Sequence, residues 1–265
     1  MSGGPANNQR AGFGRGRRRA RSSPSRHDVF FVHVMKTGGA TFRRHVYANF
    51  DPDEVYPNPS YDDMNDGNWS IEQLLSLPPE RRAVIRAYTG HFPFVVTDLL
   101  DGHFLTLAIL RDPVSRTISY LKHCKRYHEH HRDLSLEEIY DDEFYFRTMI
   151  HNHQAKLFSM TTDDRLESYM DVIEIDDDRL EIAKANLARI DLLGLNEHHD
   201  EFLAEVEERL AWWIGPVPNQ RVSEESWEAS PALRRRIASD NAADMEFYAH
   251  ARTLYEQRRR ARGEP

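Results

Sequence analysis

Buried strands alternate with helices along most of the chain. Four short apolar runs, rich in β-branched and aromatic residues, predict strands at 29–34, 83–87, 104–110 and 192–195. Helices are predicted at 40–49, 71–77, 113–125, 136–160, 180–190 and 201–213, and the last helices begin at Ser230 and Pro231, a pair typical of a helix start. This alternation indicates a parallel sheet covered by helices on both faces. We therefore expect an α/β fold with a small central parallel sheet flanked by helices and a mostly helical C-terminal half.

Two segments depart from this alternation. Residues 51–68 are polar and rich in Pro, Asn and Asp, which predicts an irregular loop. Residues 1–27 carry seven arginines and no acidic residue, and their Gly, Arg, Ser and Pro content predicts a disordered tail. A basic arm for nucleic acid or an anionic membrane, and a targeting peptide, are alternative interpretations of this tail. The ordered domain is expected to span residues 28–262.

The composition is that of a soluble globular protein. Of the 265 residues, 40% are hydrophobic and 29% are charged, which excludes a fibrous or wholly disordered chain. No apolar run approaches the ~20 residues that a membrane span needs, so we expect no transmembrane segment. The single cysteine, Cys124, excludes an internal disulfide framework and fits a reducing compartment. We therefore expect a cytoplasmic protein.

Charge is distributed unevenly along the chain. The net charge is −8, but the 238 residues after the arginine-rich tail carry 28 basic and 43 acidic side chains. The folded body is therefore acidic, and an anionic ligand has to be bound by a local site rather than attracted by the overall charge. We do not expect nucleic acid as a partner.

The turn after the first strand has the chemistry of a phosphate site. It consists of Lys36, Thr37, Gly38, Gly39, Ala40 and Thr41. A turn at a helix N-terminus offers unpaired backbone N–H groups and the positive end of the helix dipole. Glycines allow the backbone to approach an anion closely, the lysine adds a full charge, and the two threonines add hydroxyl groups. The turn is not a Walker A loop, because GxxxxGK[ST] is absent. The alternative is an ordinary strand-to-helix turn.

A second cluster follows the strand at 104–110. Arg111 lies at the carboxyl end of this strand, where ligands bind in open α/β sheets. Asp112 and Pro113 predict the start of the next helix, and Ser119 lies two turns into it, where its hydroxyl can face the same anion as Arg111. A structural Arg–Asp pair is the alternative interpretation. Together, the two clusters indicate two separate phosphates on one nucleotide.

These two stretches resemble the phosphate-binding motifs of carbohydrate sulfotransferases. The stretch Phe31 to Thr41 resembles their first phosphate-binding loop, and RDPVSRTISY resembles the motif that grips the 3′-phosphate of the sulfate donor. The resemblance is to the branch containing the heparan sulfate 2-O- and uronyl 2-O-sulfotransferases and bacterial relatives. It extends through YTGHFPF, NHQAKLF, DLLGLNEHHDEFL and DMEFYAHARTLYEQR. The chain departs from it at Met35, where proline is usual, and at Ala40, where a small hydroxylated residue is usual.

The resemblance implies a P-loop-like three-layer fold and a donor-dependent reaction. The donor would be 3′-phosphoadenosine 5′-phosphosulfate (PAPS), the product 3′,5′-adenosine bisphosphate, and the acceptor a hydroxyl of a small molecule, a carbohydrate or a glycolipid, with no metal required. Lys36 and the loop amides would hold the 5′-phosphate and stabilise the leaving oxygen. Arg111 and Ser119 would anchor the 3′-phosphate, with Arg221 as a further ligand. His91 matches the base-bearing histidine of this branch.

Other histidines have weaker claims to a chemical role. The branch carries a second histidine two residues before His91, where this chain has Thr89, so a two-histidine mechanism is not expected. His33 is interpreted as a residue that lines the core or orients the loop, and His103 as a weaker base candidate. The segment His123–His131 is rich in histidine, but its spacing matches no standard zinc template, and we interpret it as the solvated end of a helix.

Two other function classes stay open at this point. A phosphotransferase would use the same turn with ATP and Mg²⁺, with Asp112 as its candidate carboxylate, whereas a non-catalytic binding protein would act through the arginine-rich tail. The acceptor and the oligomeric state are not determined by the sequence. Tyr56, Tyr61 and Trp69, in or beside the predicted loop, could stack on a sugar ring or anchor the loop to the core.

Overall fold

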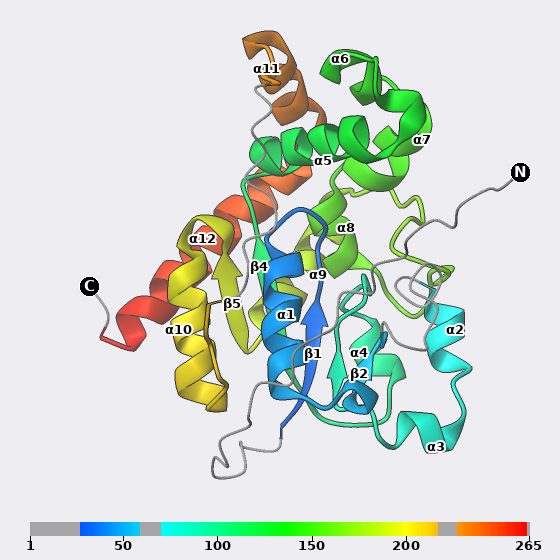
Figure 1. Cartoon of the computed structure of the whole chain (residues 1–265). Coiled ribbons are helices and arrows are strands. Elements are labelled where there is room, and N and C mark those ends of the chain that lie inside the picture. Colours follow the sequence, from blue (N-terminus) through cyan, green and yellow to red (C-terminus); the bar gives the residue numbers. More distant parts are fainter. Residues whose placement is uncertain (1–26, 59–69, 217–226, 264–265) are drawn as a thin grey trace, which may run out of the picture.

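Five parallel strands form one central sheet in the order β2-β3-β1-β4-β5 (Figure 1). The computed structural model describes residues 27–58, 70–216 and 227–263. The strands are β1 Asp28–Val32, β2 Val55–Tyr56, β3 Ala87–Tyr88, β4 Phe104–Leu110 and β5 Leu192–Leu195. The central strands β1 and β4 pair in register along the whole of β1. Because all strands run the same way, their carboxyl ends meet at one edge of the sheet.

Helices cover both faces of this sheet. The α-helices are α1 Gly39–Asn49, α2 Ile71–Leu75, α3 Pro79–Arg82, α4 Val96–Leu99, α5 Pro113–Tyr127, α6 Leu136–Tyr140, α7 Glu143–Tyr145, α8 His153–Ser159, α9 Asp177–Ala188, α10 His199–Leu210, α11 Pro231–Asp240 and α12 Ala242–Ala261. Short 3₁₀ turns lie at η1 Pro52–Glu54, η3 Glu129–His131 and η5 Asn196–His198, and η4 Phe146–Ile150 is a π-helical turn. None of the helices in the described residues is long and apolar enough to cross a membrane.

The alternation of side chains along β1 shows the three layers directly. Val29 and Phe31 pack into one core with residues of α1 and α10, whereas Phe30 and Val32 pack into a second core with residues of α5, α8, α9 and α12. All four side chains are buried, which is why the strand reads as a continuous apolar run rather than an alternating one. The expected α/β architecture, with a small parallel sheet flanked by helices and a mostly helical C-terminal half, is confirmed.

Three expectations about individual elements are wrong. The strand predicted at 83–87 is reduced to β3 at Ala87–Tyr88, because α3 ends at Arg82 with Ala83 as its C-cap, and the Ile85 N–H donates to the Arg82 carbonyl. The loop predicted at 51–68 contains β2, a two-residue strand too short for a sequence pattern. The helix predicted at 136–160 is four short segments, because a new cap begins at Asp142 and Asn152 adopts a left-handed φ of 46°. The arginine-rich tail, except for its last residue, lies outside the described residues.

The N-termini of α8 and α12 cap each other. Both oxygens of Asp244 accept hydrogen bonds from the start of α8, from the backbone N–H groups of Gln154 (3.2 Å) and Ala155 (2.7 Å). In return, the Asn152 side chain accepts from the Asp244 N–H (3.0 Å), and the Asn241 side chain accepts from the Asn152 N–H (2.8 Å). Asp244 is fully buried, and burial raises the pKa of its carboxyl group. This reciprocal cap fixes the position of α8, which contributes a side chain to the site described below.

We predict that Asp244→Ala destabilises the protein by about 2–4 kcal/mol, because it leaves two buried N–H groups of α8 without an acceptor. Asp244→Asn should cost less, since its amide oxygen still accepts one bond. Urea unfolding monitored by circular dichroism measures both, with the exposed Asp178→Ala in α9 as the control. A loss for Asp244→Ala no larger than that of the control would contradict this account of the cap.

Candidate functional site

The turn between β1 and α1 is held in shape by its own side chains and by the loop after β5. The Thr37 hydroxyl is buried and donates to the Val34 carbonyl (2.9 Å), and the Asn196 side chain donates to the Thr37 carbonyl (3.0 Å). Gly38 is the N-cap of α1 with a φ of 102°, and a Cβ there would lie 3.0 Å from Asn196 Nδ2. The Thr37 hydroxyl therefore serves the turn itself.

The residues that begin α1 lie at the carboxyl edge of the sheet. Ala40 is exposed and Thr41 is half-buried. The Thr41 N–H donates to the Gly38 carbonyl (3.1 Å), whereas the N–H groups of the first two residues of a helix, here Gly39 and Ala40, have no acceptor within it. Position 39 requires glycine for a steric reason as well as for the approach of an anion, because a Cβ there would lie only 2.2 Å from the His33 ring. Glycine at this position thus allows α1 to pack directly against His33.

Two arginines of the second motif hold two successive carbonyls of this turn. Arg111 Nη1 donates to the Lys36 carbonyl (3.1 Å), and Arg116 Nε donates to the Met35 carbonyl (3.2 Å). Arg116 is fully buried and also donates to the Met149 carbonyl (2.7 Å). Burial lowers the pKa of Arg116 to about 10, which still leaves it charged at neutral pH. These bonds fix the backbone around Lys36, whose φ of 68° is left-handed.

A cationic cavity of about 370 Å³ lies beside the turn. Three predicted residues, Lys36, Arg111 and Ser119, line it together, so the structure joins the two phosphate clusters into one site. Further cationic lining residues are Lys122, Arg126 and Arg234. Within the described parts of the chain, no carboxylate lines this cavity. Although the body of the protein is acidic, this cavity is therefore suited to a polyanion.

The extra lining residues on α5 were missed by the sequence reasoning, although a signal was present. Ser115, Ser119, Lys122 and Arg126 are three or four residues apart and so share one face of the helix. Arg234 comes from α11, more than a hundred residues later, and no local pattern points to it. Arg221, the remaining predicted phosphate ligand, lies outside the described residues.

The backbone of Arg111 is clamped by Gln154 from α8. The Gln154 side-chain amide donates to the Arg111 carbonyl (2.8 Å), and its oxygen accepts from the Arg111 N–H (3.1 Å). Asp112 accepts from the Ser115 N–H (2.8 Å) and is the N-cap of α5, as the sequence predicts. Arg111 is thus positioned from both sides, by Gln154 of α8 and by the start of α5, the helix that follows it.

His91 lies behind the turn and does not line the cavity. Its Nδ1 donates to the His33 carbonyl (2.7 Å), which leaves the lone pair of the neutral ring on Nε2. The two imidazole rings stack 4.1 Å apart, and His33 Nδ1 in turn donates to the Thr89 carbonyl (3.2 Å). Burial lowers the pKa of His91 to about 4, and the positive charges of Arg43 and Lys36 add to the effect. His91 is therefore a neutral base-type imidazole at physiological pH.

His33 and His103, the other two histidines considered for the site, lie in different parts of the structure. His33 is buried in the core beside the turn, in agreement with the sequence interpretation. His103 is exposed and precedes β4, at the opposite edge of the sheet from Arg111. Since β4 is seven residues long, roughly 20 Å of strand separates His103 from the candidate site. The structure therefore does not place His103 with the other candidates.

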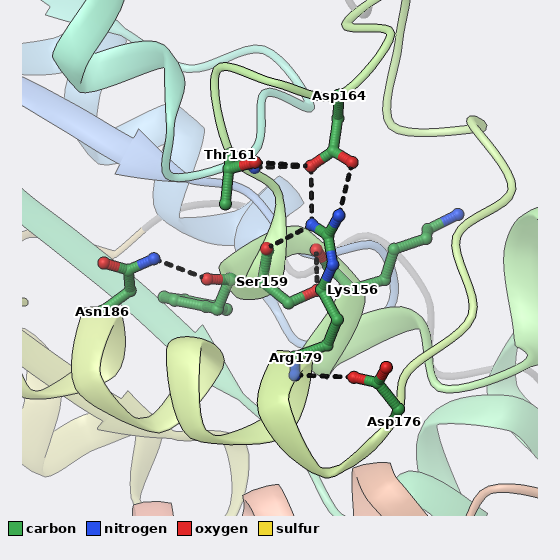
Figure 2. A network of polar contacts seen from close by, with 8 residues as sticks. Lys156, Ser159, Thr161, Asp164, Asp176, Arg179 and Asn186 are labelled. Carbon is green, nitrogen blue, oxygen red and sulfur yellow. Dashed lines mark hydrogen bonds and ion pairs between the residues drawn. The ribbon is translucent and has the colours of Figure 1, made fainter.

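The loop after α8 packs Tyr169 against His91, with ring centroids 5.3 Å apart. Figure 2 shows how this loop is anchored: Arg179 of α9 forms a bidentate ion pair with Asp164 (2.6 and 2.7 Å) and donates to the Ser159 carbonyl (3.0 Å). Lys156 extends away from this network and is buried, and burial lowers its pKa to about 7. This network therefore fixes the loop that carries Tyr169, and thus the ring packed on His91, to the end of α8.

Comparison with known proteins gives one clear match. The sequence model of the sulfotransferase family matches residues 23–251, a range that includes the turn, the second motif and His91. No curated protein matches the chain significantly.

We predict that stability falls as pH decreases from 6.5, because buried histidines have a lowered pKa, most strongly His33, His91 and His153. Burial lowers the pKa of His33, His91 and His153 in the folded protein, while in the unfolded chain each takes up a proton near pH 6.5. Below that pH the unfolded state binds more protons, which costs on the order of 1 kcal/mol per pH unit for each histidine. Urea unfolding between pH 7.5 and about pH 5 measures this slope.

The variant His153→Phe should reduce this slope by the share of one histidine, because phenylalanine takes up no proton. Wild-type stability that stays constant from pH 6.5 to about pH 5 would contradict the prediction.

Proposed function

The chain belongs to the sulfotransferase family, and from this premise we propose that it transfers a sulfuryl group from PAPS to an acceptor hydroxyl. The observation that carries the proposal is the cavity that Lys36, Arg111 and Ser119 line together. A donor with separate 3′- and 5′-phosphates requires two cationic anchors in one cleft, and the two motifs supply them. The 5′-phosphate would lie against Lys36 and the start of α1, and the 3′-phosphate against Arg111 and Ser119.

In the proposed reaction, the acceptor oxygen forms a bond to sulfur while the bond from sulfur to the bridging oxygen of the 5′-phosphate breaks. Lys36 and the N–H groups at the start of α1 stabilise the negative charge that develops on that oxygen. His91 Nε2 takes the proton of the acceptor hydroxyl. Transfer then depends chiefly on positioning and on charge stabilisation, as in phosphoryl transfer.

The low pKa of His91 keeps its imidazole neutral, as a base requires. Burial and, to a smaller extent, the charges of Arg43 and Lys36 lower this pKa in the protein alone. An anionic donor offsets the charge of Lys36, the smallest of these effects, and so raises the affinity of the imidazole for a proton. Because His91 does not line the cavity, we place the acceptor between Lys36 and His91, outside the part of the cavity that takes the nucleotide.

The alternative of a Mg²⁺–ATP phosphotransferase has less support. Asp112, its candidate carboxylate, caps α5 through the Ser115 N–H, and none of the cavity-lining residues in the described parts of the chain is acidic. A polyanion bound without an accompanying metal ion is therefore the better match to the lining.

A small-molecule or glycan acceptor is proposed on family grounds alone. Of the aromatic residues considered for stacking on a sugar, Tyr56 is buried in β2 and stacks on Phe92, with ring centroids 6.0 Å apart. It therefore anchors the loop to the core. Tyr61 and Trp69 lie outside the described residues.

We predict that 3′,5′-adenosine bisphosphate raises the thermal stability of the protein, whereas Mg²⁺–ATP does not. Binding at a hundredfold excess over Kd adds about 2.7 kcal/mol to the folded state. Arg111→Gln should weaken binding by about tenfold to a hundredfold, since a hydrogen bond to a charged group contributes about 1.5–3 kcal/mol. Arg235→Gln is the matched control, because Arg235 is exposed on α11 and does not line the cavity. Stabilisation by Mg²⁺–ATP alone would refute the proposed donor.

We predict that His91→Asn lowers the rate of sulfuryl transfer by about 10²- to 10⁴-fold, the usual contribution of a positioned base. The bisphosphate should still bind, because His91 lies outside the cavity lining. A screen with labelled PAPS against sugars, glycolipids and phenols provides the acceptor, and calorimetry measures nucleotide binding. His103→Asn should leave both unchanged. Wild-type rates in His91→Asn would remove His91 from the mechanism.

A further inference from the structure

Three metal-ligating side chains converge at the end of α5, on the side of the helix away from the cationic cavity. One potential ligand atom each from Cys124, His128 and His131 lies within 4.8 Å of the other two. Cys124 and His131 are buried, and His128 is half-buried. For Cys124 and His131, which are buried, this finding corrects the interpretation of His123–His131 as a solvated helix end, because the chain turns back after α5 and brings His131 beneath it.

The backbone holds these three residues in place. The His128 N–H makes the last helical bond of α5 to the Cys124 carbonyl (2.9 Å), and the His131 N–H closes the next turn on the His128 carbonyl (3.0 Å). Lys125 Nζ donates to the carbonyls of Arg132 (2.9 Å) and Leu134 and so fastens the chain that follows to the helix. Two backbone turns and the hydrogen bonds of Lys125 thus hold the three side chains near one another.

Two features of the histidines in this cluster point to a bound ligand. Within the residues that the structure describes, the buried Nδ1 of His131 has no hydrogen-bond partner, which is costly for a fully buried polar atom. The Tyr145 hydroxyl lies 3.1 Å from His128 Nδ1. When His128 Nδ1 donates to that hydroxyl, its Nε2 carries the lone pair, which is the usual way in which a neighbouring group orients a metal-bound histidine.

We propose that Cys124, His128 and His131 bind a divalent transition metal ion, Zn²⁺ by the chemistry of the ligands. One thiolate and two imidazoles suit zinc, and tetrahedral zinc places such ligand atoms about 3.3–3.6 Å apart, so a contraction of about 1 Å completes the site. The metal–sulfur bond forms as the Cys124 thiol gives its proton to solvent. The exposed His130, whose ring centroid lies 5.8 Å from that of His128, or a water molecule would supply the fourth ligand.

The metal would fix the end of the helix that forms one wall of the cavity. Lys122 and Arg126 line the cavity from the same two turns of α5 that contribute Cys124 to the cluster. An ion that joins α5 to η3 would therefore hold these cationic side chains in position without touching the ligand. This proposal does not depend on the nature of that ligand.

Cobalt titration of the full chain, first freed of metal with a chelator, tests the site. Cys124 is the only cysteine of the protein, so a thiolate-to-cobalt charge-transfer band in the near ultraviolet can arise only from it. We expect one equivalent of Co²⁺ to produce this band, and Zn²⁺ to abolish it by displacing the cobalt. The absence of the band in the wild-type protein would overturn the proposal.

Variants separate this site from surface binding. Cys124→Ser, His128→Ala and His131→Ala should each lose the band or weaken Co²⁺ binding at least tenfold, whereas the remote, exposed His103→Ala should keep it. Circular dichroism verifies that each variant is folded. Zn²⁺ should raise the melting temperature of the wild-type protein but not of Cys124→Ser. A band that persists in both His128→Ala and His131→Ala would show that these histidines are not ligands and would overturn the proposed site.

Discussion

The candidate site depends on two hydrogen bonds that join the two phosphate motifs. Arg111 and Arg116, both in the second motif, donate to the carbonyls of Lys36 and Met35 in the first. Charged donors to backbone carbonyls are among the stronger hydrogen bonds in proteins, and Arg116 makes its bonds in full burial. They hold Lys36 in its left-handed conformation beside α1. Together with the bonds of Thr37 and Asn196 within the turn, they fix the charge of Lys36 and the start of α1 relative to Arg111.

The same arrangement is supported from outside the motifs by buried polar groups. Gln154 clamps the Arg111 backbone, and Asp244 fixes the helix that carries Gln154. Asn196, after β5, fixes the turn from the other side. Buried polar groups with all their partners rigidify a structure, whereas partly satisfied ones destabilise it. The site is therefore specified by a connected set of hydrogen bonds that spans β1, β4, β5, α8 and α12, and not by the motifs alone.

Helix α5 has two faces with different chemistry. One face presents Ser119, Lys122 and Arg126 to the cavity, and another buries Arg116 and Cys124. This division explains how an acidic body presents a cationic cavity, since cationic side chains are concentrated along one stripe of α5. It also places the proposed metal ligands next to the cavity wall, since His123 lines the cavity and its ring centroid lies 6.1 Å from that of His128. The position of one helix therefore governs both sites.

The sequence by itself determined the features that depend on local patterns. Hydrophobic periodicity predicts the buried runs at β1, β4 and β5, and capping preferences predict the helix starts at Asp112 and Ser230. The rule that parallel strands end at one edge of a sheet predicts that Lys36, Arg111 and Ser119 come together. The short strands β2 and β3 were missed or misplaced, because two residues carry no period. Only the tertiary structure decided the roles of Gln154, Arg234 and His131. Each acts through contacts between segments far apart in the chain, or through a turn that reverses its direction, and such contacts leave no trace in the spacing of residues along one segment.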